Sequence, residues 1–264
     1  MTLPSITLVV GTDAKYLPQL KVSSPTWRKN RPEMWSWPMV LFYDRQQLSH
    51  QEMLDFVESE LRHPLCQLVG WPPPTVDHTL YESQRDRMLA GHVFVPARHV
   101  HTAYFMKLDC DAVARPHKQW IDPAWFEGLP SIVAPRWGYT KGRNALPTLE
   151  AWADGIAEFV GTSRLNILQE PDQMRVGHAR FCSWASYYRT DFAKMVARMC
   201  AQSIGPCRIP VPSQDTVHFY VAARLGITMK IANQKNRGWS NHPKFGSLKA
   251  QAEAIMREAE PANG

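Results

Sequence analysis

Residues 104–113 read YFMKLDCDAV, and this stretch decides how the 264-residue chain is interpreted. Four of its first five residues are apolar, which predicts a short buried strand. Asp109 and Asp111 follow directly at the carboxyl end of that strand. Because open parallel sheets bind their ligands at the carboxyl ends of the strands, the position of the two aspartates predicts a functional site.

The chemistry of Asp109 and Asp111 favours a metal. Two carboxylates on a rigid sheet edge are hard oxygen ligands that suit Mg²⁺ or Mn²⁺, which also bind substrate phosphates. The alternative is that both residues only cap the strand or form its turn. In the context of a buried strand we expect metal binding.

Three further apolar segments predict strands that precede this one: residues 5–12 (SITLVVGT), 39–44 (MVLFYD) and 66–71 (CQLVGW). The first two end in polar residues, as parallel strands often do. A helix capped by Ser49 separates the second from the third, so the pattern alternates strand and helix.

Prolines and turn residues set the remaining elements. Between the first two strands we expect one short helix, interrupted by Pro25 and Pro32. The other expected elements are a helix around 79–90, a strand in 130–137, a strand in 179–190, a helix over 212–226 with Ser213 as N-cap, and a surface helix over 247–260. The fold class is therefore α/β: one domain with a mostly parallel central sheet flanked by helices, and a mixed, less regular C-terminal half.

Composition narrows the class of protein. With 44% hydrophobic residues and 10 Trp, the chain is neither disordered nor fibrous. No segment is long and apolar enough for a signal peptide or membrane span, so we expect a soluble, cytoplasmic protein. We infer no obligate protein partner from the sequence. The five cysteines are odd in number and widely spread, which indicates reduced thiols. The net charge of +6 favours an anionic partner, such as nucleotide phosphates or a nucleic acid.

Motifs of several common enzymes are absent. The sequence has no G-x-x-x-x-G-K-[ST], G-x-G-x-x-G, H-E-x-x-H or G-x-S-x-G pattern, which disfavours P-loop NTPases, Rossmann dehydrogenases, zincins and serine hydrolases. A nucleotidyltransferase also pairs carboxylates with metal and phosphate, but no glycine-rich phosphate loop follows the first strand.

The order of these elements resembles the nucleotide-sugar glycosyltransferases of the GT-A fold, of the family 2 kind, whose D-x-D ends a central strand. The resemblance covers roughly residues 5–226, and the D-x-D is its specific element. It implies that residues 1–113 form a nucleotide-sugar-binding half, residues 114–245 an acceptor-binding half, and residues 246–264 a C-terminal helix and tail.

The resemblance also implies roles for individual residues. Thr12 and Asp13, at the end of the first strand, would hold the nucleobase. The D-x-D would hold the metal and the ribose, with Asp109 also contacting the nucleotide sugar. Asp215, which opens a late helix, would be the general base of an inverting reaction, and His242 a further metal ligand.

Each of these roles has a plainer alternative. Acids are common in the first turn of a helix because they complement its dipole, so Asp215 could be only a helix-terminal residue. His242 could be polar surface. Arg85 is our candidate for a further contact to the diphosphate or base, and a salt-bridged surface arginine is its alternative. His99 and His101 share a strand face, and we interpret them as ordinary strand residues.

Aromatic residues raise a similar question. The pairs Trp35/Trp37 and Trp120/Trp125 could stack on a sugar or base, but packing is the simpler interpretation.

The predicted reaction is metal-dependent transfer of a sugar from a nucleotide-diphosphate sugar, with UDP favoured, to an acceptor hydroxyl, with inversion if Asp215 is the base. Basic and aromatic residues alternate in 26–31, 136–144 and 233–239, which is typical of nucleic-acid surfaces. A hydroxymethylated DNA base is therefore a possible acceptor. The rival acceptors are a saccharide, a lipid-linked sugar or a protein hydroxyl. A non-catalytic protein that binds nucleotides or nucleic acid on the same fold is the alternative of another class.

Overall fold

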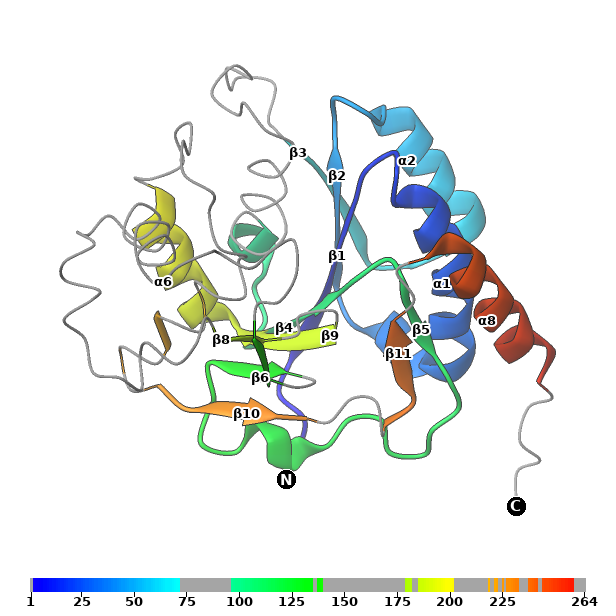
Figure 1. Cartoon of the computed structure of the whole chain (residues 1–264). Coiled ribbons are helices and arrows are strands. Elements are labelled where there is room, and N and C mark those ends of the chain that lie inside the picture. The colour runs from blue at the N-terminus through cyan, green and yellow to red at the C-terminus, as the bar shows by residue number, and fades with distance from the viewer. Residues whose placement is uncertain are drawn as a thin grey trace.

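The computed structural model describes residues 2–71, 96–134, 137–139, 179–181, 185–201, 218, 221–222, 225, 227–232, 237–241 and 244–258. Within these ranges the structure has the predicted α/β architecture, with helices on both faces of a central sheet (Figure 1). None of the helices within these ranges is long and apolar enough to cross a membrane.

The central sheet has seven strands in the order β10-β6-β9-β4-β1-β2-β3. The strands are β1 (Ile6–Thr12), β2 (Met39–Asp44), β3 (Cys66–Trp71), β4 (Tyr104–Leu108), β6 (Ile132–Ala134), β9 (Ala185–Arg189) and β10 (Met229–Ile231). β9 is antiparallel to its neighbours β4 and β6, and the other adjacent pairs are parallel. The sequence therefore predicted the mostly parallel sheet correctly.

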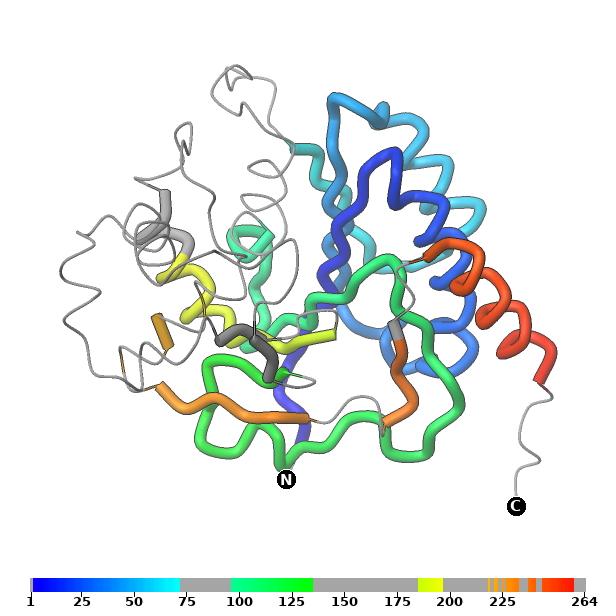
Figure 2. The backbone as a smooth tube through the Cα atoms, viewed as in Figure 1, coloured from blue at the N-terminus to red at the C-terminus, as the bar shows by residue number. Residues whose placement is uncertain are grey.

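Alternating side chains divide the core between the two faces of the sheet. Leu8 of β1, Leu41 of β2 and Met106 of β4 belong to one large apolar cluster with α1 (Leu17–Asn30) and α2 (His50–Phe56). Strand residues of the opposite parity face the other way, where Phe105 stacks on Tyr188 of β9. α6 (Thr190–Ala201) follows β9 on that side (Figure 2). Both faces are covered, which explains why β1 and β4 are almost entirely apolar.

The helix between β1 and β2 is longer than the sequence predicted. α1 spans 14 residues and continues through Pro25, although a proline in a helix interior costs about 3 kcal/mol. The helical turn after Pro25 is held by hydrogen bonds to β5, the strand over Ala112–Ala114. Trp27 is fully buried and donates Nε1–H to the carbonyl of Ala112 at 2.7 Å, and the Thr26 hydroxyl accepts from the amide of Ala114 at 3.1 Å. Tertiary packing thus offsets the local penalty.

The 179–190 segment also differs from the prediction of one strand. It contains β8 (Ala179–Phe181) and β9, and Thr190 already begins α6. β8 pairs with β7 (Trp137–Tyr139) in a separate two-stranded sheet. The strand predicted to end before Asp109 is present: β4 ends at Leu108, and β5 (Ala112–Ala114) is a separate strand after Asp111.

A second two-stranded sheet joins distant parts of the chain. β5 pairs antiparallel with β11 (Trp239–Asn241), and α8 (Phe245–Arg257) packs across α1 and β5 (Figure 1). Leu248, Ala252 and Ile255 of α8 form an apolar cluster with Val113. The C-terminal helix predicted to lie on the surface is therefore docked through one buried face.

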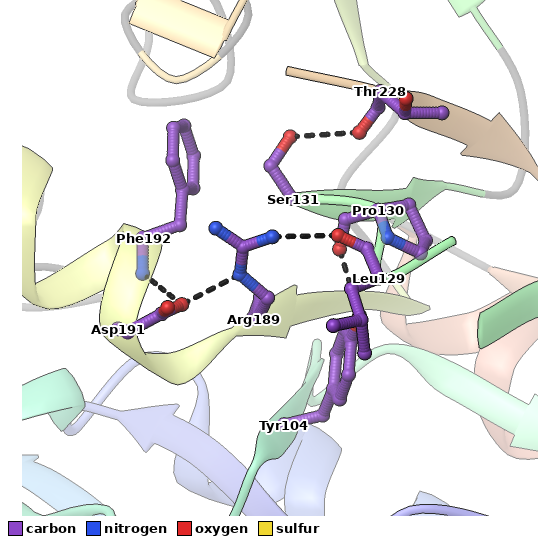
Figure 3. Close-up of polar contacts among 8 residues, drawn as sticks. All are labelled: Tyr104, Leu129, Pro130, Ser131, Arg189, Asp191, Phe192 and Thr228. Atoms are coloured by element: carbon purple, nitrogen blue, oxygen red, sulfur yellow. Dashed lines mark hydrogen bonds and ion pairs between the residues drawn. The ribbon is translucent and has the colours of Figure 1, made fainter. Parts of the chain in front are cut away.

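Polar contacts fasten the end of β9 to its neighbours (Figure 3). The Arg189 guanidinium contacts the Asp191 carboxylate at 2.6 Å and donates to the carbonyl of Leu129 at 2.6 Å. Tyr104, which opens β4, donates its hydroxyl to the carbonyl of Pro130 at 2.9 Å. This cluster lies at the opposite end of β4 from Asp109, so it stabilises the sheet and does not form part of the candidate site.

Four short helical segments complete the described part of the chain. They are η1 (Pro32–Ser36), η2 (Val57–Leu61), η5 (Pro96–His99) and η6 (Pro123–Phe126). Ser49 caps the start of α2, as predicted, and forms a capping box there, because Ser49 and Glu52 exchange hydrogen bonds.

His63, which follows η2, gives the stability a specific pH dependence. The amide of Leu65 donates to its Nδ1 at 3.3 Å, so the ring proton belongs on Nε2, which lies 3.3 Å from the carbonyl of Met34. Burial lowers the pKa of His63 below its usual value, and the Met34 contact only partly opposes this effect. The neutral ring is therefore the form that suits the fold.

As the pH falls below about 6.5, His63 of the unfolded chain takes up its proton before His63 of the folded chain does. The stability that wild type gains from neutral His63 is complete above that pH and decreases toward the folded-state pKa. We expect the difference in unfolding free energy between wild type and His63→Gln, measured by urea titration, to shrink from about pH 7.5 to pH 5. A constant difference across this range would contradict the prediction.

Candidate active site

The candidate site lies where β1 and β4 end. The two strands are parallel neighbours, with Val10 opposite Leu108. The residues that follow each strand therefore meet at one edge of the sheet. A hydrogen bond shows that the two strand ends are in contact: the thiol of Cys110, after β4, donates to the carbonyl of Gly11 in β1 at 3.0 Å. Asp109 and Asp111 on one side thus lie close to the end of β1 on the other.

Asp109 is held by a lysine of its own strand. Lys107 of β4 is buried, with 7% of its side chain exposed, and its ammonium group contacts Oδ1 of Asp109. Asp109 is 32% exposed, so it connects the buried lysine to the surface. Since residues two apart in a strand share a face, the strand geometry itself aligns the pair.

Asp111 lies directly before β5. Two other elements, α1 and β11, hold β5 in place. The carbonyl of Ala112 accepts the indole proton of Trp27, and its amide donates to the carbonyl of Asp109 at 3.1 Å. β11 ends at Asn241, which pairs with Ala112. The backbone that carries Asp111 is therefore held by α1 and by β11 together.

Thr12 and Asp13 are both buried at the end of β1. Oδ1 of Asp13 accepts from the amide of Tyr16 at 2.8 Å, and the Asp13 carbonyl accepts from the amide of Leu17 at 2.8 Å. Asp13 thus forms the turn that leads into α1. The Thr12 hydroxyl lies 3.4 Å from the same carbonyl.

Cys110 reports on the charge of the site. Burial raises the pKa of its thiol, the Thr12 side chain opposes this rise, and the negative charges of Asp109, Asp111 and Asp13 raise it further. All three carboxylates therefore act electrostatically on one buried thiol at the carboxyl edge of the sheet.

The donor set fits a hard divalent cation. Carboxylate oxygens are the ligands that Mg²⁺ and Mn²⁺ prefer, and Lys107 already offsets part of the charge on Asp109. Within the described residues, no three His, Cys, Asp or Glu side chains are placed to hold a metal by themselves. Besides one or two carboxylates, such cations commonly take substrate phosphates as ligands.

Three candidate residues lie outside the described residues: Arg85, Asp215 and His242. Their proposed roles stay predictions, as does the division of the chain after residues 113 and 245. Asn241, the residue before His242, is described through its pairing with Ala112.

The aromatic pairs pack within the protein, as expected. Trp120 and Trp125 are buried, and Trp37 lies against Trp120 with ring centroids 5.6 Å apart. Trp35 donates its indole proton to the carbonyl of Arg62.

The two histidines predicted to share a strand do not lie in one. His99 ends η5 and His101 lies in the turn before β4, because β4 begins only at Tyr104. Both line an open cavity of about 380 Å³ with Cys66 and Thr7, at the end of the sheet opposite the D-x-D. They therefore contribute nothing to the candidate metal site.

Two of the three basic and aromatic segments bury several of the residues that the structure describes, although Arg28 in the first segment is exposed. Trp27 and Arg31 in the first segment are fully buried. In the third segment, Trp239 is buried, and Arg237 contacts Asp122 and the Trp125 ring. In the 136–144 segment the structure describes only β7. These side chains support the fold, which weakens the case for a nucleic-acid groove built from them.

Sequence reasoning missed Lys107 and Cys110 as parts of the site. A signal for Lys107 was present: a lysine within an otherwise apolar strand, two residues before an aspartate, needs a partner on its own face. No local signal marks Cys110, because its partner, Gly11, lies 99 positions away in the chain.

Comparison with known proteins establishes the fold. No protein-family model and no curated protein matches the sequence. Among solved structures, core-mannan synthase A from Aspergillus fumigatus, in a form with Mn and GDP, superposes with a TM-score of 0.52 at 12% identity, over 90% of this chain and 75% of that one. The mannosyltransferase Ktr4p from S. cerevisiae in complex with GDP gives 0.50 at 12% identity, over 97% and 82%.

A third similar structure is an archaeal enzyme, the mannosyltransferase PcManGT from Pyrobaculum calidifontis in complex with GDP-Man and Mn²⁺. Its TM-score is 0.50 at 12% identity, over 88% of this chain. This chain spans about half of that protein, 55% of its length. The chain therefore has the GT-A fold of nucleotide-sugar glycosyltransferases, as its sequence predicted.

The pair of Lys107 and Asp109 predicts a coupled effect on stability. Asp109→Asn leaves the buried ammonium group of Lys107 without the Asp109 carboxylate, which we expect to cost about 3 kcal/mol of unfolding free energy. The double variant Lys107→Met/Asp109→Asn should recover at least about 1 kcal/mol of this loss, because no unpaired charge remains. Urea unfolding of wild type, both single variants and the double variant measures the coupling. Strictly additive effects would show that the contact is not energetically significant.

Burial and the surrounding carboxylates predict an unreactive Cys110. The thiolate is the reactive form, and a raised pKa keeps the thiol protonated. We expect iodoacetamide at about pH 8 to leave Cys110 unmodified in the native protein and to alkylate it after unfolding in urea. Peptide mass spectrometry reads the modification directly. Alkylation of native Cys110 at the rate of the unfolded chain would contradict the geometry described above.

Proposed function

We propose that this chain is a metal-dependent glycosyltransferase that moves a sugar from a nucleotide-diphosphate sugar to an acceptor hydroxyl. One observation carries the proposal: on a GT-A fold, Asp109 and Asp111 follow the central strand β4 at the edge where Thr12 and Asp13 end β1. Ligands of open α/β sheets bind at such carboxyl edges.

In this proposal, each described site residue contacts a different part of the nucleotide-sugar donor or its cation. Asp111 holds a divalent cation, Mn²⁺ or Mg²⁺, and Asp109, oriented by Lys107, contacts the ribose. Thr12 and Asp13 contact the nucleobase. Since Oδ1 of Asp13 accepts from Tyr16, contact with the base falls to Oδ2.

Residues outside the described part complete the proposed site. Arg85 contacts the diphosphate or the base, and His242 is a further metal ligand. The pairing of Asn241 with Ala112 supports the role of His242, because His242 follows Asn241 and Asp111 precedes Ala112. In an antiparallel pair these two neighbours leave the ladder at the same end.

The proposed chemistry is a single displacement. The acceptor hydroxyl oxygen attacks the anomeric carbon, and the bond from that carbon to the diphosphate oxygen breaks with its electron pair on the leaving group. Asp215 receives the acceptor proton as general base, which gives inversion. A bound divalent cation would supply electrostatic stabilisation of the departing diphosphate. If Asp215 only caps its helix, a retaining transfer is the alternative.

Donor and acceptor identity are the finer parts of the proposal. The sequence favoured UDP, whereas the similar mannosyltransferase structures carry GDP or GDP-Man, so both nucleotides belong in the test. For the acceptor, a hydroxymethylated DNA base stands beside a saccharide, lipid-linked sugar or protein hydroxyl. Burial of Trp27 and Arg31 favours the second group.

The decisive experiment measures release of nucleoside diphosphate from UDP- and GDP-sugars with and without Mn²⁺. We expect turnover by wild type that depends on Mn²⁺ and falls about 100-fold or more in Asp111→Asn, because the cation loses its main ligand. Asp55→Asn, which removes a carboxylate from the exposed side of α2, is the matched control and should retain full activity.

A second arm adds acceptors to the same assay. Hydroxymethylated duplex DNA and a panel of free sugars are each added to the best donor. Faster release with DNA, together with binding that weakens steeply with salt, supports the DNA acceptor. Failure of wild type both to turn over any donor and to bind any nucleotide in Mn²⁺ would overturn the glycosyltransferase proposal.

A further inference from the structure

The last turn of α1 contacts the strand that follows the D-x-D through three side chains. Trp27 donates to the carbonyl of Ala112 at 2.7 Å, the Thr26 hydroxyl accepts from the amide of Ala114 at 3.1 Å, and Asn30 donates Nδ2–H to the carbonyl of Ala114 at 2.8 Å. β5 has only three residues. Its position is therefore set as much by α1 as by its pairing with β11.

Arg31 fixes the partner strand. Its guanidinium lies over the rings of Trp120 and Trp239, 5.2 Å from each centroid, and donates to the carbonyl of Arg237 at 3.1 Å. Gly238, with φ of +78°, makes this approach possible, because a Cβ there would lie 2.8 Å from Nη2 of Arg31. Arg31 thus holds β11 from its first residue.

Lys29 fixes the helix that follows β11. Its ammonium group donates to three carbonyls at the end of α8, those of Ile255 at 3.0 Å, Met256 at 3.2 Å and Glu258 at 2.6 Å. A cation at the C-terminus of a helix satisfies its last carbonyls and complements its dipole. Together with the buried face of α8, this contact fastens both ends of the 237–258 segment to α1.

These contacts converge on the ends of two strands. Ala112 and Asn241 form the last pair of the β5–β11 ladder. Asp111 is the residue before Ala112 in the sequence, and His242 is the residue after Asn241. We propose that five residues at the end of α1, here called the α1 clamp, position the backbone of Asp111 and thereby set the metal affinity of the site: Thr26, Trp27, Lys29, Asn30 and Arg31.

The inference rests on the proposed function, since it concerns the same metal site. It assigns a role to a basic segment whose sequence alone suggested contact with nucleic acid. None of the clamp residues needs to touch the cation. They act through the backbone of β5, β11 and α8, so they are positioning residues, and loss of such support typically weakens metal binding 10- to 100-fold.

The test measures Mn²⁺ affinity directly, by electron paramagnetic resonance of free Mn²⁺ in the presence of UDP or GDP. Lys29→Met and Asn30→Ala each remove one arm of the clamp at a partly exposed position, so the fold is retained. We expect about 10-fold weaker Mn²⁺ binding in each, and recovery in Lys29→Arg. Lys21→Met is the matched control: it removes a lysine of the same helix that pairs with Glu60 on the surface, and its affinity should equal that of wild type.

If the clamp residues only stabilise the fold, the Mn²⁺ titration has a different result. It would lower the unfolding midpoint of Lys29→Met and Asn30→Ala while the folded protein bound Mn²⁺ as tightly as wild type, and that outcome overturns the inference. If wild type binds Mn²⁺ and Asp111→Asn does not, the proposed function stands whatever the clamp variants do. If wild type itself binds no Mn²⁺ with either nucleotide, both proposals fall together.

Discussion

The parallel pairing of β1 with β4 is the constraint on which the candidate site depends. Both strands are buried on both faces, and their register places Val10 opposite Leu108. A slip of one residue would turn Lys107 toward the apolar cluster beneath α1, where no carboxylate pairs with it. The core therefore fixes the register, and the register fixes which side chains meet at the carboxyl edge.

That edge carries more negative charge than a stable turn requires. Asp13 has a structural use, since it forms the entry to α1, and Asp109 has Lys107. Both nevertheless act, together with Asp111, on the buried thiol of Cys110, because each charge raises the pKa of that thiol. All three charges would attract a divalent cation bound at this edge.

Local patterns explain how much of this structure the sequence could predict. The first strands and the Ser49 cap of α2 were predicted almost to the residue, because apolar runs and helix caps act within a few positions. The continuation of α1 through Pro25 was not predicted. The contact that compensates for the proline joins Trp27 to Ala112, which lies 85 positions away in the chain. For the same reason, the D-x-D could be located from its strand, whereas the support of β5 by α1 and β11 could not.

The fate of the positive charges shows why composition alone misleads about partners. A net charge of +6 favours an anionic ligand, yet several of the cations are used inside the fold: Lys29, Arg31, Lys107, Arg189 and Arg237. Four of these, all except Lys107, bind backbone carbonyls of segments far away in the chain, which a neutral side chain of that length would hold less strongly. Two of the cations in the basic cluster at 26–31, Lys29 and Arg31, therefore hold the C-terminal strand and helix against α1. A basic segment in such a chain can therefore have either of two uses. Its cations can hold distant backbone carbonyls in place, or they can bind an anionic partner.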